Sequence, residues 1–275
     1  MTTDIKSMQL YPRAERILTD LRALGYTDDM PVSVDVLNRF DQLHYHGTDA
    51  LDAAISDTGM KTDDQVLEVG SGWGGCARYL AQRAGANLTA VELQEDYHRI
   101  AQNLTARAGL GSAVTHVNAD FLALNLPDTR FDRVVSWLAL FHIPDRSRYL
   151  SKIHAALKPG GTFFAEDLFL ITPPAPDEID DFRAHLFPNS LVDHETYHST
   201  LRDAGFTIIE STDMTADWTA FTADRLVSFR KAQAAYEAIH GKDGFDIIET
   251  FYSKMSGYFQ RGLVGGLRFT AKRNV

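Results

Sequence analysis

The chain of 275 residues has a single cysteine, Cys76, and no long apolar run. One cysteine excludes an intrachain disulfide and a cysteine-rich metal site, and it fits a reducing compartment. No stretch approaches the roughly 18 to 20 apolar residues of a membrane-spanning helix. The first residues, MTTDIKSMQLYPRAER, lack the apolar core of a signal peptide. We therefore expect a cytoplasmic protein with no membrane partner.

Basic side chains are also scarce, with 27 Lys and Arg against 37 Asp and Glu and a formal net charge of −10. Binding a nucleic-acid backbone requires clustered Lys and Arg, so we expect no nucleic acid as the main ligand. The balance still leaves room for a local basic pocket around a small molecule. The composition gives no indication of the oligomeric state.

From residue 64 onward, short apolar runs alternate with helical spacings. This rhythm predicts a doubly wound α/β sheet, mostly parallel, with a long helical region at about 214–262 before the last strand. The expected strands are QVLEVG (65–70), LTAVEL (88–93), VTHVNAD (114–120), FDRVVSWLAL (131–140), GTFFAEDLFL (161–170), FTIIESTD (206–213) and GLRFTAK (266–272).

Two segments fall outside this rhythm. Residues 1–60 have helical spacings, and residues 171–198 form a Pro-rich, acidic insertion that carries several histidines. We expect 1–60 to be a helical lid and 61–275 to be one core domain, with a cap insertion at about 171–198. His194 and His198 are four residues apart, but no third ligand is evident, so no metal site is expected.

The most informative segment is a glycine-rich turn that follows the first strand. Gly70, Gly72 and Gly75 satisfy G-x-G-x-x-G, a pattern that suits a dinucleotide equally well. Glu68 precedes them and would repel a pyrophosphate, whereas it suits a ligand with an ammonium group, such as S-adenosylmethionine. The alternative is a tight turn without a ligand.

Acidic residues follow the next two strands. A carboxylate at Glu92 can accept hydrogen bonds from both hydroxyls of a ribose, or it can be a charge favoured at a helix N-terminus. Asp120 can accept from an adenine amino group while the backbone N–H of Phe121 donates to the ring. Asp120 can equally be an ordinary turn residue.

Five short motifs, taken together, resemble those of a known superfamily. VLEVGSGWGG, AVEL, NADF, FHIPDR and LKPGG, in this order and spacing, are similar to the signature motifs of class I S-adenosylmethionine-dependent methyltransferases. The resemblance covers about residues 35–275. Within the superfamily the chain is most similar to N-methyltransferases of the phosphoethanolamine and sarcosine/dimethylglycine types, through SWLALFHIPDR, YHSTLRDAGFTIIESTDMT and GLVGGLRFTAKR. The resemblance implies a Rossmann-like sheet whose last strand is antiparallel.

The resemblance also implies roles for individual residues. His142 matches a histidine that sits over the acceptor nitrogen, and Tyr45, in FDQLHYHG, is the candidate for its tyrosine partner. Trp137 and Leu138 stand where phosphoethanolamine enzymes have an acidic and arginine pattern, a departure that argues against a phosphorylated acceptor. The implied cofactor residues are Glu68, Gly70, Gly72 and Gly74 for the methionine part, Glu92 for the ribose, Asp120 and Phe121 for the adenine, and Ser136 and Trp137 beside the cofactor.

These observations predict a methyltransferase for a small molecule, with an amine nitrogen as acceptor. Methyl transfer is an in-line displacement that requires positioning, exclusion of water and, for a protonated amine, removal of a proton by a base such as His142. An enzyme that methylates oxygen, sulfur or carbon would bind the cofactor through the same residues, so these acceptor atoms remain alternatives. The alternatives of another class are an NAD-dependent oxidoreductase and a non-catalytic nucleotide-binding protein.

Overall fold

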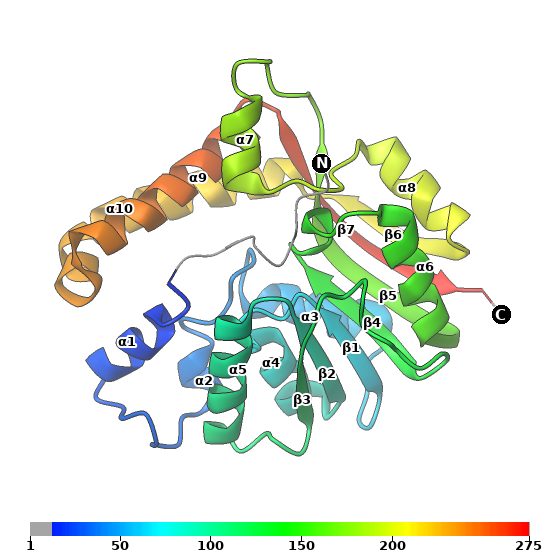
Figure 1. Ribbon diagram of the computed structural model, residues 1–275, viewed down its shortest axis with the longest axis horizontal. Helices are drawn as coiled ribbons and strands as arrows, with labels where there is room; N and C mark the ends of the chain where they lie inside the picture. Colours follow the sequence, from blue (N-terminus) through cyan, green and yellow to red (C-terminus); the bar gives the residue numbers. More distant parts are fainter. Residues whose placement is uncertain (1–12, 275) are drawn as a thin grey trace.

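A computed structural model describes residues 13–274 and has the expected α/β architecture (Figure 1). One seven-stranded sheet has the order β3-β2-β1-β4-β5-β7-β6, in which β1 to β5 are parallel and β7 runs antiparallel between β5 and β6. This topology confirms the predicted fold class. The strands are β1 (Gln65–Val69), β2 (Asn87–Glu92), β3 (Val114–Asn118), β4 (Phe131–Trp137), β5 (Leu157–Leu170), β6 (Phe206–Asp213) and β7 (Val264–Arg273).

The central strands bury both of their faces, which explains their nearly continuous apolar sequences. On β4, Val134 packs on one side with α6 (Arg146–Ala156) and α8 (His194–Asp203). Its neighbour Val135 packs on the other side with α3 (Thr48–Thr58) and α4 (Gly75–Ala84). The sheet therefore separates two apolar layers. The chain order reverses between β1 and β4, and an open α/β sheet places its ligands at the carboxyl edge of such a point.

Strand β4 ends three residues earlier than the apolar run predicts. Leu138 adopts a left-handed conformation with φ of 51°, which turns the chain out of the sheet. The next residues form a short 3₁₀ helix, η2 (Leu140–His142). This turn carries His142 to the carboxyl edge of the sheet.

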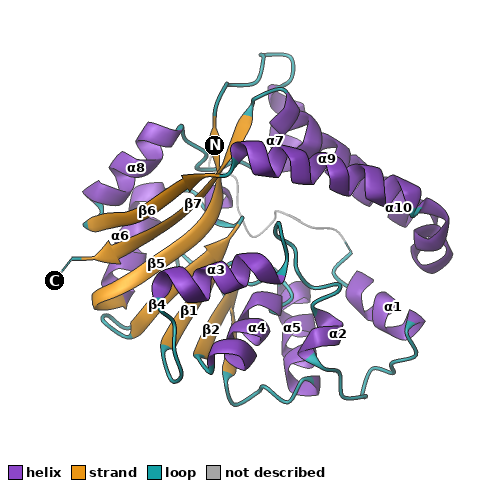
Figure 2. Cartoon of the chain, turned by 180° about the vertical axis from the view of Figure 1, so that it is seen from behind, coloured by secondary structure: helices purple, strands orange, loops and turns teal. Residues whose placement is uncertain are grey.

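The segment expected as a cap divides into two parts with different surroundings. Helix α7 (Ile179–Leu186) lies outside the sheet layers (Figure 2). Helix α8 instead flanks the sheet, and its Tyr197 and Leu201 are fully buried in the main core. The part of the insertion outside the layers is thus 171–193, because α8 supplies an ordinary crossover helix between β5 and β6.

The helical region between β6 and β7 folds into a long hairpin of α9 (Thr215–Lys231) and α10 (Gln233–Gln260). It projects beyond the sheet (Figures 1 and 2). The two helices pack through aromatic rings, and Phe229 stacks on Phe245 with 4.9 Å between centroids. At the tip, His240 Nε2 lies 2.6 Å from Asp20 of α1 (Arg16–Ala23). The hairpin thus spans from the sheet to the N-terminal helix, a contact that the sequence did not predict.

The N-terminal segment is packed firmly on the core domain. Residues 1–12 of the expected lid lie outside the described residues. The remainder comprises α1, α2 (Val34–Leu37) and α3, and Asp41 in the connecting loop forms a fully buried ion pair with Arg78 of α4 at 2.9 Å. The indole nitrogen of Trp73 also donates to the carbonyl of Ala14 at 3.0 Å. Between residues 13 and 274, no helix is long and apolar enough to cross a membrane.

Replacing Asp41 by Ala should lower the free energy of unfolding by about 3 to 5 kcal/mol, because it leaves the Arg78 charge buried without its partner. Urea unfolding measures this effect. Asp28→Ala is a matched control, since it removes an exposed ion pair with Arg22 and should change stability little. Equal effects of the two substitutions would contradict the structural role of the Asp41–Arg78 pair.

Candidate active site

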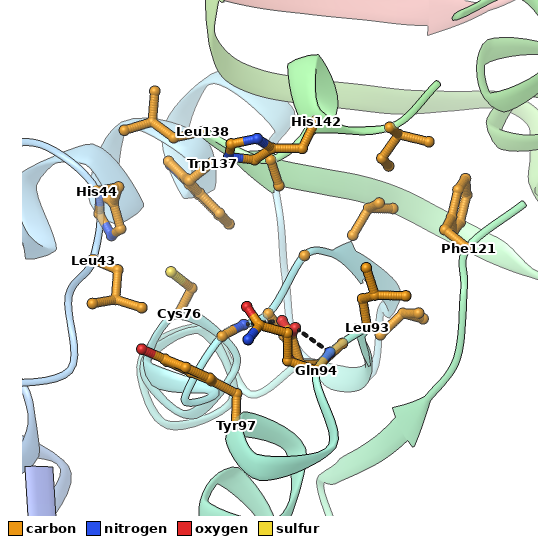
Figure 3. A pocket seen from close by; sticks show the side chains of 18 of the residues that line it. Leu43, His44, Cys76, Leu93, Gln94, Tyr97, Phe121, Trp137, Leu138 and His142 are labelled. Atoms are coloured by element: carbon orange, nitrogen blue, oxygen red, sulfur yellow. Dashed lines mark hydrogen bonds between the residues drawn. The ribbon is translucent and has the colours of Figure 1, made fainter. Parts of the chain in front are cut away.

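A cleft opens at the carboxyl edge of β1 to β4 and encloses about 960 Å³ of space, part of it open to solvent (Figure 3). His142, Trp137 and His44 lie along one side, and Gln94 and Tyr97 lie opposite. The wall is built from residues 69–72, 91–94, 119–121, 137–139 and 142–143, together with Asp41, Leu43, His44, Cys76 and Tyr97.

The glycine turn forms the floor of this cleft. Gly70 and Gly72 have φ of 79° and 51°, a conformation that side chains rarely adopt. A Cβ on Gly70 would also collide with Ala139, which follows β4. Gly74, with φ of 74°, caps α4 and faces His116 and Arg78, so it shapes the turn from behind the cleft wall. The turn therefore leaves backbone exposed to a ligand at Gly70 and Gly72.

Glu92 stands at the end of β2 and lines the cleft. Its carboxylate accepts hydrogen bonds from the backbone N–H groups of Gly72, at 2.7 Å, and Gln94, at 2.8 Å. Burial raises the pKa of Glu92, and these hydrogen bonds oppose that effect. Two carboxylate oxygens can accept about four hydrogen bonds, so Glu92 keeps capacity for a ligand hydroxyl.

Asp120 and Phe121 form the cleft wall after β3. One oxygen of Asp120 accepts from the backbone N–H of Leu122 at 2.8 Å, which orders the turn. Phe121 is buried and presents an aromatic surface. The two expected adenine contacts thus lie in the same cleft as Glu92.

Glu68 lies behind the glycine turn and not in the cleft wall. Its side chain is fully buried on the α4 side, and one of its oxygens has no hydrogen-bond partner among residues 13–274. Burial raises the pKa of Glu68 to about 8, partly offset by Cys76 and Arg78. A carboxyl group that is largely protonated at pH 7 would not repel a pyrophosphate. The electrostatic argument from Glu68 therefore does not decide between the two classes of cofactor.

Ser136 and Trp137 point to opposite faces of β4. The hydroxyl of Ser136 is buried and donates to the carbonyl of Val69 at 2.8 Å, so it joins β4 to β1 away from the cleft. Trp137 lines the cleft, and its ring lies 5.7 Å from that of His44. The buried indole N–H of Trp137 has no partner within the described part of the chain.

His142 ends η2 and borders both the cleft and a smaller adjoining chamber. Its Nδ1 lies 3.1 Å from the carbonyl of Phe187, and a carbonyl only accepts, so Nδ1 carries the proton. Nε2 is then an unprotonated acceptor, and it is buried with no partner among the described residues. Burial lowers the pKa of His142 to about 4. The imidazole is therefore neutral at pH 7.

The insertion holds the turn that carries His142. The Asn189 amide donates to the carbonyl of His142 at 2.7 Å, and the Ser190 hydroxyl donates to that of Leu140 at 3.1 Å. From below, buried Asp167 accepts from the Tyr197 hydroxyl at 2.9 Å and from the backbone N–H of Phe141 at 3.4 Å. Position and tautomer of His142 thus depend on residues that are distant in sequence.

Tyr45 lies in the wall of the chamber that His142 borders. Its ring packs against Trp218, with 4.9 Å between centroids, and under the guanidinium of Arg225, also at 4.9 Å. Burial raises the pKa of Tyr45 to about 12, so it stays a hydrogen-bond donor. The structure therefore brings Tyr45 and His142 to one cavity.

Arg225 of α9 also lines this chamber, and it is a site residue that the sequence did not predict. Trp218, Phe221 and Arg225 are three and four residues apart and share one face of the helix. This spacing, an arginine on the same helix face as two aromatic residues, is the sequence feature from which a role for Arg225 in the site could have been predicted. In the insertion, His194 and His198 lie 4.4 Å apart between ring centroids, and residues 13–274 hold no group of three or more potential ligands placed for a metal.

Comparison with known proteins relates this site to a described family. Residues 66–161, which run from the second residue of β1 through β4 to the start of β5, match the family model described as a methyltransferase domain. The match includes the part of the chain that carries the glycine turn, Glu92 and Asp120.

The relatives of this chain are methyltransferases whose names give different acceptors. The sarcosine/dimethylglycine N-methyltransferase of Halorhodospira halochloris is 31% identical over 153 residues, which cover 56% of this chain and 55% of the relative. The sterol 24-C-methyltransferase erg-4 of Neurospora crassa is 36% identical over 105 residues, covering 38% of this chain and 28% of the relative. The chain thus spans about half or less of the length of these curated relatives.

A solved structure has the same fold. Phosphoethanolamine N-methyltransferase 2 of Haemonchus contortus, solved with phosphomonomethylethanolamine and S-adenosylhomocysteine, superposes with a TM-score of 0.78 at 21% identity. The match covers 86% of this chain and 55% of that chain. It shows that the sheet and its surrounding helices have the class I methyltransferase arrangement.

The His142 imidazole should titrate with a pKa of about 4, well below the 6.5 of an exposed histidine. NMR of ¹⁵N-labelled histidine, assigned with a His142→Gln variant, should show a neutral ring protonated on Nδ1 at pH 5.5. An unfolded chain takes up this proton near pH 6.5, so this residue lowers the free energy of unfolding as pH falls from 6.5 to 4. A pKa of 6 or above would contradict the buried, neutral state.

Proposed function

We propose that this protein is an S-adenosylmethionine-dependent methyltransferase that acts on the nitrogen of a small-molecule amine. The observation that carries the proposal is the cleft at the carboxyl edge of β1 to β4. It combines the glycine turn with Glu92 inside the matched methyltransferase domain. The N-methyltransferase relatives support the choice of acceptor atom. A cytoplasmic location and the absence of a nucleic-acid partner stay predictions from the sequence.

The polar groups of the cleft fit such a cofactor. The buried hydroxyl of Ser71, the indole N–H of Trp137 and Nε2 of His142 all belong to the lining residues, and none has a partner between residues 13 and 274. Buried polar atoms are normally hydrogen-bonded, so these atoms favour a polar ligand. When bound, S-adenosylmethionine supplies a methyl group on a sulfonium, which is already a good leaving group.

Each part of the cleft has a place in this proposal. Gly70 and Gly72 would face the methionine part, and Glu92 would accept from the ribose hydroxyls. Asp120 and Phe121 would hold the adenine, and Trp137 would border the cofactor. Glu68, Gly74 and Ser136 would act indirectly, because they shape the turn and the strand junction from behind the wall.

His142 would orient the acceptor amine through Nε2. A pKa of about 4 makes its imidazole neutral but weakly basic, so it suits accepting a hydrogen bond better than storing a proton. Tyr45, which stays protonated, would close the other side of the chamber. The buried walls exclude water and hold the acceptor lone pair in line with the methyl group.

The direct test is methyl transfer. The protein would be incubated with isotope-labelled S-adenosylmethionine and a panel of amines, amino acids and phenols, and the products identified by mass spectrometry. We expect labelled N-methyl products. Transfer only to oxygen or carbon would overturn the choice of nitrogen, and no transfer to any acceptor with cofactor bound would overturn the activity.

The Glu92→Ala variant should bind S-adenosylhomocysteine about ten-fold to a hundred-fold more weakly than the wild type, because a charge-assisted hydrogen bond contributes roughly 1.5 to 3 kcal/mol. Calorimetry measures this, with wild-type affinity expected in the micromolar range and no binding of NAD. Glu95→Ala removes a neighbouring exposed carboxylate and should leave affinity unchanged. Tighter binding of NAD than of S-adenosylhomocysteine would refute the cofactor assignment.

Replacing His142 by Ala should lower kcat by about a hundred-fold, because the acceptor is no longer held in position, while the affinity for S-adenosylhomocysteine stays nearly unchanged. His142→Gln keeps a hydrogen-bond acceptor and should recover part of the loss if Nε2 orients the amine. Steady-state kinetics of both variants decide the role. Identical losses in the two variants would argue for proton uptake by His142, and an unchanged kcat in His142→Ala would remove the residue from catalysis.

A further inference from the structure

A large groove adjoins the cleft between the N-terminal segment and the α9–α10 hairpin. It encloses about 1770 Å³ of space, part of it open to solvent. Leu43, His44 and Tyr97 line both this groove and the cleft. Phe187, Arg225 and Phe251 line both the groove and the chamber of His142. The three cavities therefore adjoin one another and share parts of their walls.

The groove is basic, although the protein as a whole is acidic. Its lining holds three arginines, Arg16, Arg39 and Arg225, and one carboxylate, that of Asp246. Asp246 is itself paired with Lys242 at 2.5 Å. Within residues 13–274, none of the three arginines forms an ion pair with an acid. In a chain with a net charge of −10, this concentration of unneutralised positive charge is a local feature of one cavity.

Arg225 is the arginine that reaches furthest toward the chamber of His142. Its guanidinium lies over three rings, 4.4 Å from the centroid of Tyr252, 4.9 Å from Tyr45 and 5.2 Å from Phe221. These aromatic faces hold the cation in place without neutralising its charge. Its Nε is buried and has no hydrogen-bond partner in the described part of the chain. A positioned guanidinium that no carboxylate among residues 13–274 neutralises is suited to a carboxylate or phosphate.

The rest of the groove wall mixes polar side chains, such as Gln42, His185 and Thr250, with a larger apolar surface. Phe40, Phe221, Ile247, Ile248 and Phe251 all line it. The space is larger than a simple amino acid requires, and these side chains offer no hydrogen bonds to a small polar molecule. Such a wall suits an alkyl or aryl body that is removed from water.

We propose that the groove binds the methyl acceptor as an organic anion with an apolar body, and that Arg225 anchors its carboxylate or phosphate. The apolar body would lie against the aromatic wall, and the reacting nitrogen would enter the chamber beside His142. This proposal rests on the methyltransferase function. It assigns Arg225 as the residue that selects acceptors by charge.

The test measures binding and does not require turnover. Phenylacetate, phenyl phosphate and the neutral analogue phenylacetamide would be titrated by calorimetry into the protein saturated with S-adenosylhomocysteine. We expect at least one anionic probe to bind about ten-fold or more tightly than the amide. Arg225→Met should reduce its affinity by about ten-fold to a hundred-fold, and Arg225→Lys should lose less. Preference for phenylacetate or for phenyl phosphate identifies the anionic group.

Lys231→Met is the matched control, because it removes one positive charge from an exposed position on the same helix and should leave binding unchanged. Binding of the amide as tight as that of both anions would overturn the proposal, as would no binding of either anion or equal loss in Arg225→Met and Lys231→Met. The comparison of acid and amide uses the wild type alone, so it holds even if Arg225→Met does not fold. Anion binding with no methyl transfer would instead contradict the methyltransferase function.

Discussion

The contact between the ends of β1 and β4 determines how the site is built. The chain after β4 places the methyl group of Ala139 where a side chain on residue 70 would be, so only glycine fits there. The same turn lies close enough to β2 for Glu92 to accept from the backbone of Gly72. The ends of β1, β2 and β4 thus all contact the glycine turn, and the backbone of this turn faces the cleft. Other features of the cleft are arranged around this turn.

The acceptor side of the site depends on a different set of contacts. η2 is held from above by Asn189 and Ser190 of the insertion and from below by Asp167 of β5. Phe187 fixes the proton on Nδ1 of His142, which leaves Nε2 as a buried acceptor with no partner among residues 13–274. The cost of burying the imidazole is visible in its lowered pKa, and that pKa favours orientation of an acceptor over storage of its proton. The insertion therefore defines the chemical state of His142 as well as its position.

The α9–α10 hairpin gives the groove its charge and its wall. The hairpin extends from the edge of the sheet to α1, where His240 contacts Asp20. It therefore forms the wall of the groove that lies opposite the N-terminal segment. The N-terminal segment, in turn, is tied to α4 by the buried Asp41–Arg78 pair. One wall of the groove is thus anchored in the core, and the other is carried by a projecting hairpin.

The sequence by itself determined the fold class, the glycine turn and the acids after β2 and β3, because these depend on local periodicity and on residues close together in the chain. It also placed His142 at the carboxyl edge, although it extended β4 to residue 140, since an apolar run does not reveal the left-handed turn at Leu138. Only the tertiary structure shows that Glu68 and Ser136 lie behind the cleft wall and that α8 packs on the sheet. It also shows that Arg225 lines the chamber of His142. Those outcomes depend on which face of a strand is covered and on contacts between segments as much as 180 residues apart, such as Tyr45 and Arg225. Burial, and with it the protonation state of Glu68 and His142, exists only once those segments have packed.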